Sequence, residues 1–175
     1  MHAMQAGLRQ SLKEAVGFAG VAAGVLILDQ ATKAWVLGSL WPPESEKFTL
    51  VVPGLLRFQA ARNTGAAFSL FQEHPGVLTL IASMLALCVL GWRFLLPPKA
   101  MGERFALAMI FGGAVGNLVD RFRFGYVVDF IVAHWRDHAW PTFNLADSAI
   151  CVGIGVFLIS SWIAARSAHC AEASE

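Results

Sequence analysis

Four long apolar stretches restrict the fold of this chain more than any other feature of its sequence. They cover about residues 16–40, 77–96, 105–119 and 143–165. A helix needs about 20 apolar residues to cross the hydrocarbon layer of a bilayer. The chain is 57% hydrophobic and only 14% charged, which excludes an ordinary soluble domain. We therefore predict a single membrane domain, residues 1–175, built as an all-α bundle of four transmembrane helices.

The segments between these stretches complete the predicted fold. In the outer loop 41–76, the sequence KFTLVVPGLLRFQAA has two short apolar runs around a Pro-Gly pair, which predicts a β-hairpin. The second outer loop, 120–142, is rich in aromatic residues, which favour the headgroup region of a bilayer. Arg9 and Lys13 precede the first stretch as in a signal peptide. Because no small-residue cleavage site follows them, we predict an uncleaved span.

Positive charge alone does not decide the orientation of the spans. Six Lys or Arg residues flank the spans on each side, although the short turn RFLLPPKAMGER, 93–104, holds three of them. When Arg62 and Arg121 are set aside as candidate site residues, the balance favours both termini in the cytoplasm. The net charge is +1, so the sequence offers no basic surface for nucleic acid.

Polar and charged residues gather at one predicted membrane face. With a rise of about 1.5 Å per residue, Asp29 lies roughly 20 Å along a span that begins near residue 16, and Lys33 is one turn further. The other spans place their polar ends at the same face. Burying charge near hydrocarbon costs roughly 2.5–3.5 kcal/mol per residue, so these groups must face one another or water. The residues are Asp29, Lys33, Asn63, Asn117, Asp120, Arg121, Asp129, Asn144 and Asp147.

Four of these residues fit a structural ion-pair network. Asp29 and Lys33 are four residues apart and can pair along one helix face. Asp120 and Arg121 can neutralise partners on neighbouring helices. Ion-pair networks that only stabilise a fold also perturb ionisation, so buried charges do not by themselves indicate catalysis. We therefore assign a structural role to these four residues.

Asp129 and Asp147 differ, because neither has a basic neighbour at helical spacing. Two carboxyl groups that approach each other at low dielectric cannot both ionise, so one of them keeps a proton. Such a pair can activate water and protonate a leaving amine. The alternative is that Asp147 is a carboxylate stabilised by the start of a helix, with Asn144 as its N-cap. Spacing alone leaves both interpretations open.

Other chemistries fit the sequence less well. His134 and His138 are four residues apart, but no H-E-x-x-H pattern or cysteine partner accompanies them, so we expect no metal and no cofactor. The pair Gly112 and Gly116 has the spacing of close helix packing. A small transporter or ion-pathway subunit is the alternative function, because buried charges can mark a solute path. The apolar inner half of the spans disfavours it. A purely structural membrane partner is a third class.

Five motifs occur in one order across the four spans. Together they closely resemble the lipoprotein signal peptidase family, also called signal peptidase II, over roughly residues 16–165. Any one of the motifs alone is a weak signal, whereas all five in order are specific. The motifs are DQATK (29–33), ARNTGAAFS (61–69), GGAVGNLVDR (112–121), YVVDF (126–130) and FNLADS (143–148).

The resemblance implies a multi-pass aspartic endopeptidase of the bacterial cytoplasmic (inner) membrane. Both termini would lie in the cytoplasm, the active site near the outer leaflet, and a small extracytoplasmic β-sheet, the cradle, at the predicted hairpin. The enzyme would cleave diacylglyceryl-modified prolipoproteins just before the lipidated cysteine. Its expected partners are these substrates and membrane lipids, with globomycin-type peptides as inhibitors, and it would be a monomer.

The resemblance also implies roles for individual residues. Asp129 and Asp147 match the catalytic pair of the family. The remaining polar residues match positions that shape the substrate pocket or support the pair. These supporting residues are Asp29, Lys33, Asn63, Asn117, Asp120, Arg121 and Asn144.

Overall fold

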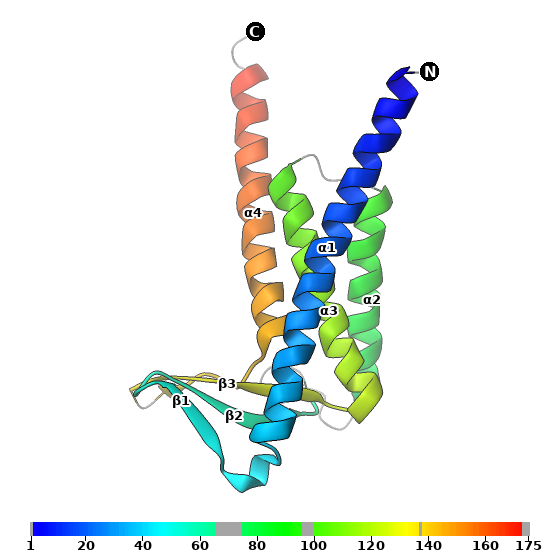
Figure 1. The fold of residues 1–175 in the computed structure, drawn as a ribbon. Helices are drawn as coiled ribbons and strands as arrows, with labels where there is room; N and C mark the ends of the chain where they lie inside the picture. Colours follow the sequence, from blue (N-terminus) through cyan, green and yellow to red (C-terminus); the bar gives the residue numbers. More distant parts are fainter. Residues whose placement is uncertain (1, 66–74, 96–99, 137, 173–175) are drawn as a thin grey trace.

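Four helices stand on a small sheet in the computed structural model of the chain, which describes residues 2–65, 75–95, 100–136 and 138–172 (Figure 1). The start of the first helix and the end of the last helix both lie at the end of the bundle away from the sheet (Figure 1). The helices are α1 (His2–Ser39), α2 (Pro75–Leu95), α3 (Met101–Phe124) and α4 (Leu145–Glu172).

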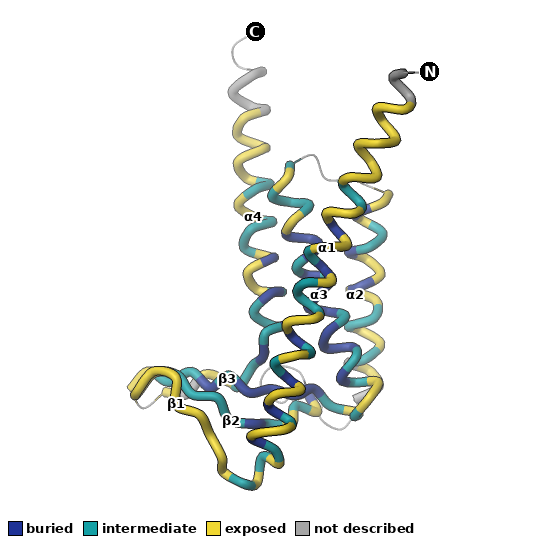
Figure 2. Tube along the Cα trace, in the orientation of Figure 1, coloured by how far each residue is buried: buried dark blue, intermediate teal, exposed yellow. Residues whose placement is uncertain are grey.

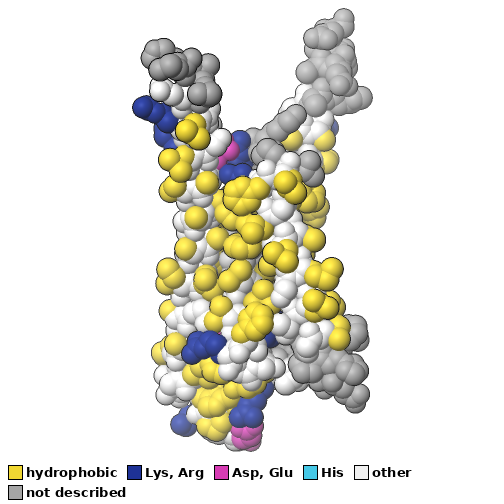
Figure 3. All heavy atoms as spheres, turned by 90° about the vertical axis from the view of Figure 1, so that its right-hand side faces the viewer, with side chains coloured by type: hydrophobic (Ala, Val, Ile, Leu, Met, Phe, Trp, Pro, Cys, Tyr) yellow, Lys and Arg dark blue, Asp and Glu magenta, His cyan; other side chains and the backbone are white. Residues whose placement is uncertain are grey.

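Three helical segments of the described chain are long and apolar enough to cross a membrane, namely Gln5–Ser39, Met101–Phe124 and Leu145–Ser167. The apolar part of α2, Thr79–Leu95, is shorter. Hydrophobic side chains cover the middle of the bundle face seen in Figure 3, with Lys and Arg toward its ends. A surface of this kind suits a lipid environment. Parts of three predicted segments lie outside the described residues. They are residue 96 of the predicted span 77–96, residues 66–69 of the motif 61–69, and residues 66–74 of the loop 41–76.

Helix α3 is longer than the predicted span 105–119. It runs from Met101 to Phe124 and is capped by Gly125, whose φ of 78° closes the helix and whose N–H donates to the Arg121 carbonyl. The polar DRFR segment interrupts the hydrophobic run, but arginine is a good helix former and the helix continues through it. Asp120 and Arg121 therefore lie on a helix and not in a loop.

Glycines allow α3 to pack closely between its neighbours, which contact it on several sides. A Cβ atom on Gly112 would lie 2.6 Å from the Ala22 carbonyl oxygen of α1, and one on Gly116 would lie 2.6 Å from Asp29 Oδ2. The predicted role of this glycine pair in helix packing is confirmed. Figure 2 shows that α3 carries much of the buried surface of the bundle.

The sheet is antiparallel, with its strands in the order β1-β2-β3-β4. The predicted Pro-Gly hairpin is present, with Gly54 in a left-handed conformation at its turn. The predicted loop 120–142 is corrected, because it supplies the longest strand. That strand is covered on both faces and thus reads as a continuous apolar run without alternation. The strands are β1 (Phe48–Val52), β2 (Leu56–Asn63), β3 (Val127–Trp135) and β4 (His138–Ala139).

The sheet is fixed to the end of α1. Val36 of α1 and Leu40, the residue just after α1, pack against Val128 and Phe130 of β3, and all four side chains are buried. These apolar contacts hold β3 so that its buried aspartate, Asp129, faces the ends of α3 and α4.

Candidate active site

All nine polar residues singled out in the sequence belong to one connected set of hydrogen bonds and ion pairs at the sheet end of the bundle. They come from α1, β2, α3, β3 and the start of α4. The predicted convergence of these residues is therefore found in the structure, and the contacts separate it into a buried ion cluster and a pair of carboxyls.

The ion cluster surrounds Lys33, which is 2% exposed. Its Nζ donates to Asp29 Oδ2 and Asp120 Oδ2, both at 2.9 Å, and to Asn117 Oδ1 at 3.0 Å. The three N–H groups of the ammonium thus have three acceptors, as a buried cation requires. The predicted pairing of Asp29 with Lys33 is confirmed, and so is the neutralisation of Asp120 by a neighbouring helix.

The two aspartates of the cluster also fix other elements of the fold. Asp29 Oδ1 accepts the backbone N–H of Ala146 in the first turn of α4 at 3.0 Å. Asp120 Oδ2 accepts the backbone N–H of Val128 in β3 at 3.0 Å. Each carboxylate thereby attaches one of the two segments that carry the candidate catalytic residues.

Asn144 and Asp147 form a reciprocal cap at the start of α4. The Asp147 N–H donates to Asn144 Oδ1 at 2.9 Å, and the Asn144 N–H donates to Asp147 Oδ2 at 3.2 Å. This is the capping-box arrangement, in which two helix-start donors are satisfied at once. The predicted N-cap is confirmed.

Asn117 links the cap to the ion cluster. Its Oδ1 accepts from Lys33 and, at 3.1 Å, from the Asn144 side-chain amide. Because both of these partners donate, the amide nitrogen must point the other way, where it donates to Asp147 Oδ1 at 2.8 Å. Asp147 is therefore held from two sides.

Asp129 lies on β3 and is 2% exposed. Asn144 Nδ2 donates to its Oδ1 at 2.7 Å, and Asn63 Nδ2 donates to its Oδ2 at 2.8 Å. Burial raises the pKa of the Asp129 carboxyl to about 7, with a further contribution from the charge of Asp147, against the hydrogen bonds of the two asparagines and the charge of Lys33. A carboxyl group with such a pKa can hold a proton near neutral pH.

Arg121 lies near acidic groups of neighbouring elements, as predicted for a residue that neutralises partners there. Its guanidinium donates to the Asn117 carbonyl of its own helix at 3.4 Å and interacts electrostatically with Asp147 and Asp129. The carboxyl pair therefore has a cation nearby, although none stands at helical spacing in the sequence. Spacing missed it because Arg121 reaches the pair from a different helix.

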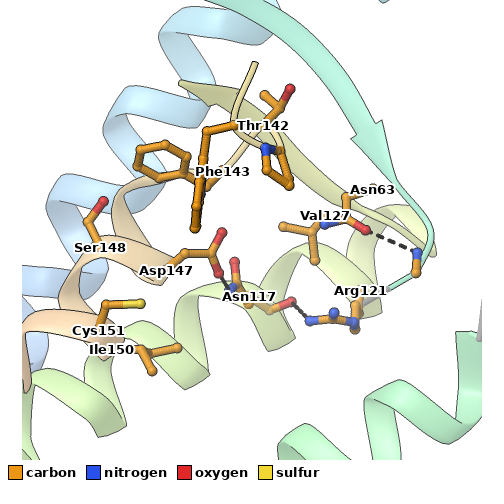
Figure 4. Close-up of a pocket in the computed structure, with 13 residues that line it drawn as sticks. Asn63, Asn117, Arg121, Val127, Thr142, Phe143, Asp147, Ser148, Ile150 and Cys151 are labelled. Atoms are coloured by element: carbon orange, nitrogen blue, oxygen red, sulfur yellow. Dashed lines mark hydrogen bonds between the residues drawn. The ribbon is translucent and has the colours of Figure 1, made fainter. Parts of the chain in front are cut away.

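A cavity of about 420 Å³ opens beside these residues (Figure 4). Asn63, Arg121 and Asp147 supply polar groups to its wall, whereas Asp129, which accepts a hydrogen bond from Asn63, does not line it. The remaining wall includes Trp140, Phe143, Ile150 and Cys151, which the sequence did not single out. Phe143 is placed there by pairing of its backbone with Ile131 of β3. The aromatic content of residues 120–142 was the available signal for part of this wall.

The chemical groups of the site are carboxyl, amide and guanidinium groups. Among the residues that the structure describes, no cluster of three or more His, Cys, Asp or Glu side chains is arranged to hold a metal ion. A partly exposed carboxyl beside a cavity, next to a buried carboxyl with a raised pKa, is an arrangement suited to acid–base chemistry.

Comparison with known proteins places these features in a family context. The family model described as signal peptidase (SPase) II matches residues 21–163. A lipoprotein signal peptidase of Teredinibacter turnerae is 40% identical over 158 residues, which cover 88% of this chain and 92% of the relative. A lipoprotein signal peptidase of Xylella fastidiosa is 43% identical over 141 residues, covering 78% and 83%.

Solved structures share the fold. A bacterial membrane enzyme determined at 2.3 Å by the in meso method superposes with a TM-score of 0.71 and 26% identity, over 83% of this chain and 87% of the other. A second bacterial membrane enzyme, determined at 1.9 Å, gives a TM-score of 0.69 and 26% identity, over 82% and 90%.

Proposed function

The chain belongs to the signal peptidase II family, and on this premise we propose that it removes lipoprotein signal peptides as an aspartic endopeptidase. Its substrates are diacylglyceryl-modified prolipoproteins, which it cleaves just before the lipidated cysteine. The observation that carries the proposal is that Asn144 contacts both candidate carboxyls, one with its side chain and one with its backbone. Asp129 and Asp147 are thereby held as a pair although they lie on separate elements.

In the proposed reaction the two carboxyls have different roles. Asp147 faces the cavity, and its carboxylate accepts hydrogen bonds from the Asn117 amide and from the Asn144 N–H at the start of α4. It takes a proton from a water molecule, whose oxygen attacks the carbonyl carbon of the scissile peptide bond. Asp129 holds the proton of the pair, in keeping with its raised pKa.

The proton on Asp129 then assists the departure of the leaving group. As substrate binds, its carbonyl oxygen replaces the Asn63 amide at Asp129 and accepts a hydrogen bond from the protonated carboxyl. When the C–N bond breaks, a proton passes to the departing cysteine nitrogen, and the new carboxylate leaves with the signal peptide. Arg121 stands beside the cavity and lowers the energy of the negative charge that develops there.

The position of the site supports its placement in the membrane. The site lies at the sheet end of the bundle, and the start of α1 and the end of α4 lie at the opposite end (Figure 1). We propose that the sheet lies at the outer leaflet of the bacterial inner membrane, with both termini in the cytoplasm. The enzyme is proposed to act as a monomer and to be inhibited by globomycin-type peptides.

The test is cleavage of a purified diacylglyceryl prolipoprotein by the Asp129→Asn and Asp147→Asn variants. Each substitution removes an ionisable proton while keeping the size of the side chain, and each should lower turnover by at least about a thousandfold. Glu46→Gln, an exposed change near the sheet, should retain wild-type turnover. Full turnover by either aspartate variant would rule out the proposed pair.

A further inference from the structure

We propose that the outer end of the sheet binds the phosphate of a phospholipid headgroup, in a basic hollow separate from the active-site cavity. The hollow has a volume of about 250 Å³ and is bounded by the β1–β2 hairpin and the end of β3. Arg57, His134 and Arg136 supply its polar groups, and Leu50, Val52 and Leu55 supply apolar ones. This inference concerns lipid binding and does not depend on the proposed peptidase reaction.

Two nitrogen atoms of the hollow lack partners. Arg57 Nε and His134 Nε2 are both buried, and neither has a hydrogen-bond partner among the described residues. A buried polar group without a partner is uncommon, because it loses its hydration without compensation. Two such atoms in one hollow, with no carboxylate among the described residues that line it, indicate a site for an anion. Phosphate oxygens can accept from an arginine and from the N–H form of an imidazole.

The strand register prepares this arrangement. Arg57 pairs with Leu50 on β1 and with Val132 on β3, and directly paired residues project from the same face of a sheet. His134 lies two residues after Val132, so its side chain is on that same face. The His134 N–H donates to the Leu55 carbonyl at 2.7 Å, which attaches the end of β3 to the hairpin. The guanidinium of Arg57 lies 5.8 Å from the Phe48 ring, which further limits its movement.

The apolar surroundings favour a lipid over free phosphate. Every residue of β1 is exposed, including Phe48, Leu50, Val51 and Val52. Figure 2 shows this exposed strand at the edge of the sheet, which extends sideways from the foot of the bundle. A basic hollow beside an exposed apolar strand suits the boundary between headgroups and acyl chains. The phosphate would occupy the hollow, while the acyl chains contact the apolar residues of β1.

This binding would act on the same strands that form the active site. Arg57 and Asn63 lie at the two ends of β2, and Asp129 and His134 lie on β3. A headgroup held at the outer end would therefore set the height and tilt of the sheet relative to the bilayer. The active-site end of the sheet would meet the substrate peptide at a defined depth.

The test measures lipid binding by the full-length protein in micelles of an uncharged detergent. Short-chain phosphatidylglycerol is the probe, and its binding is followed by native mass spectrometry and calorimetry. The variant with Arg57→Gln and Arg136→Gln should bind at least about tenfold more weakly, because charge-assisted hydrogen bonds are lost. Arg136→Gln alone changes an exposed residue and should give a smaller loss in a normally folded protein. Lys47→Gln removes the same charge just before β1 and should leave binding unchanged.

Two further probes distinguish binding of the phosphate group from binding of the acyl chains. Inorganic phosphate should bind far more weakly than the lipid, and a short-chain diacylglycerol without phosphate should not discriminate between wild type and the double variant. If inorganic phosphate and phosphatidylglycerol bound with equal affinity, the hollow would be a site for a free anion, and the proposal would be overturned. Equal phosphatidylglycerol binding by wild type and the double variant, or an equal loss in Lys47→Gln, would overturn it as well.

Discussion

The Asn144 N–H donates to the carboxylate of Asp147 at 3.2 Å while the Asp147 N–H donates to the Asn144 side chain at 2.9 Å. The same Asn144 side chain donates to Asp129 at 2.7 Å. A helix cap and a catalytic pair are usually considered as alternatives for an aspartate at a helix start. Here the cap is the device that orients Asp147, so the two interpretations of this residue are compatible.

Substitution of Asn144 can separate these two roles. Serine is as good an N-cap as asparagine but has no amide to donate to Asp129, so Asn144→Ser should keep the stability of the cap that Asn144→Ala loses. The turnover of Asn144→Ser should fall by about tenfold or more, since Asp129 loses one of its two donors. Asn144→Ala should lose the same turnover and in addition about 1 kcal/mol of stability. Wild-type turnover in Asn144→Ser would show that the amide only caps the helix.

The raised pKa of Asp129 predicts the direction of the pH dependence. Turnover should fall as the pH rises through about 7, because the proton held by Asp129 is then lost. The Asn63 hydrogen bond lowers this pKa in the free enzyme, so Asn63→Ala should raise it and move the alkaline limb of the kcat/KM profile to higher pH. The profile of a lipopeptide substrate without ionisable side chains checks the prediction. An alkaline limb unchanged in Asn63→Ala would contradict the assignment of the proton to Asp129.

The same shift predicts how stability depends on pH. The pKa of Asp129 is raised from 3.8 to about 7, so the unfolded chain loses this proton at lower pH than the folded protein does. The contribution of the neutral carboxyl is therefore fully present below about pH 3.8 and is lost as the pH rises toward 7. Thermal unfolding in detergent, followed between roughly pH 5 and 8, should show this loss as a falling melting temperature. In Asp129→Asn this part of the pH dependence should disappear.

The sequence predicted the membrane spans and the convergence of polar residues better than it predicted the sheet. Hydrophobic runs and the rise of a helix suffice to place Asp29, Lys33 and Asn117 near one membrane face. The strand that carries Asp129 was assigned to a loop, because its burial on both faces removes the alternation that marks a strand. Register with β2 is a long-range property that a local pattern does not contain.

The partners of each polar residue were also only partly predictable. Spacing of four residues found the pair of Asp29 and Lys33, which lies within one helix. It did not find Arg121 beside the carboxyl pair, because that contact joins different elements. The resemblance to a family named the two aspartates, whereas the network through Asn117 and Asn144 required the structure.

Removal of Lys33 should show how strongly the ion cluster supports the site. Lys33→Met leaves Asp29 and Asp120 buried without their cation, which should cost about 3–5 kcal/mol of unfolding free energy. A triple variant that adds Asp29→Asn and Asp120→Asn removes the two uncompensated charges and should recover much of that loss. Chemical unfolding in mixed micelles measures the unfolding free energy of both variants. Failure of the triple variant to recover any stability would show that packing of the lysine stem, and not its charge, is what matters.

Close approach of α3 to the ion cluster leads to a last prediction about Gly116. A Cβ at this position would lie 2.6 Å from Asp29 Oδ2, and that carboxylate is already fixed by Lys33 and the Ala146 N–H. Gly116→Ala should therefore destabilise the protein by about 1–3 kcal/mol, because the overpacked side chain has little room to move. Gly155→Ala on α4 is the matched control, since its Cβ meets nothing within 4 Å. The control should be neutral or stabilise the helix by up to about 1 kcal/mol. Equal melting temperatures of the two variants in the same detergent would mean that α1 and α3 can separate at this crossing without cost.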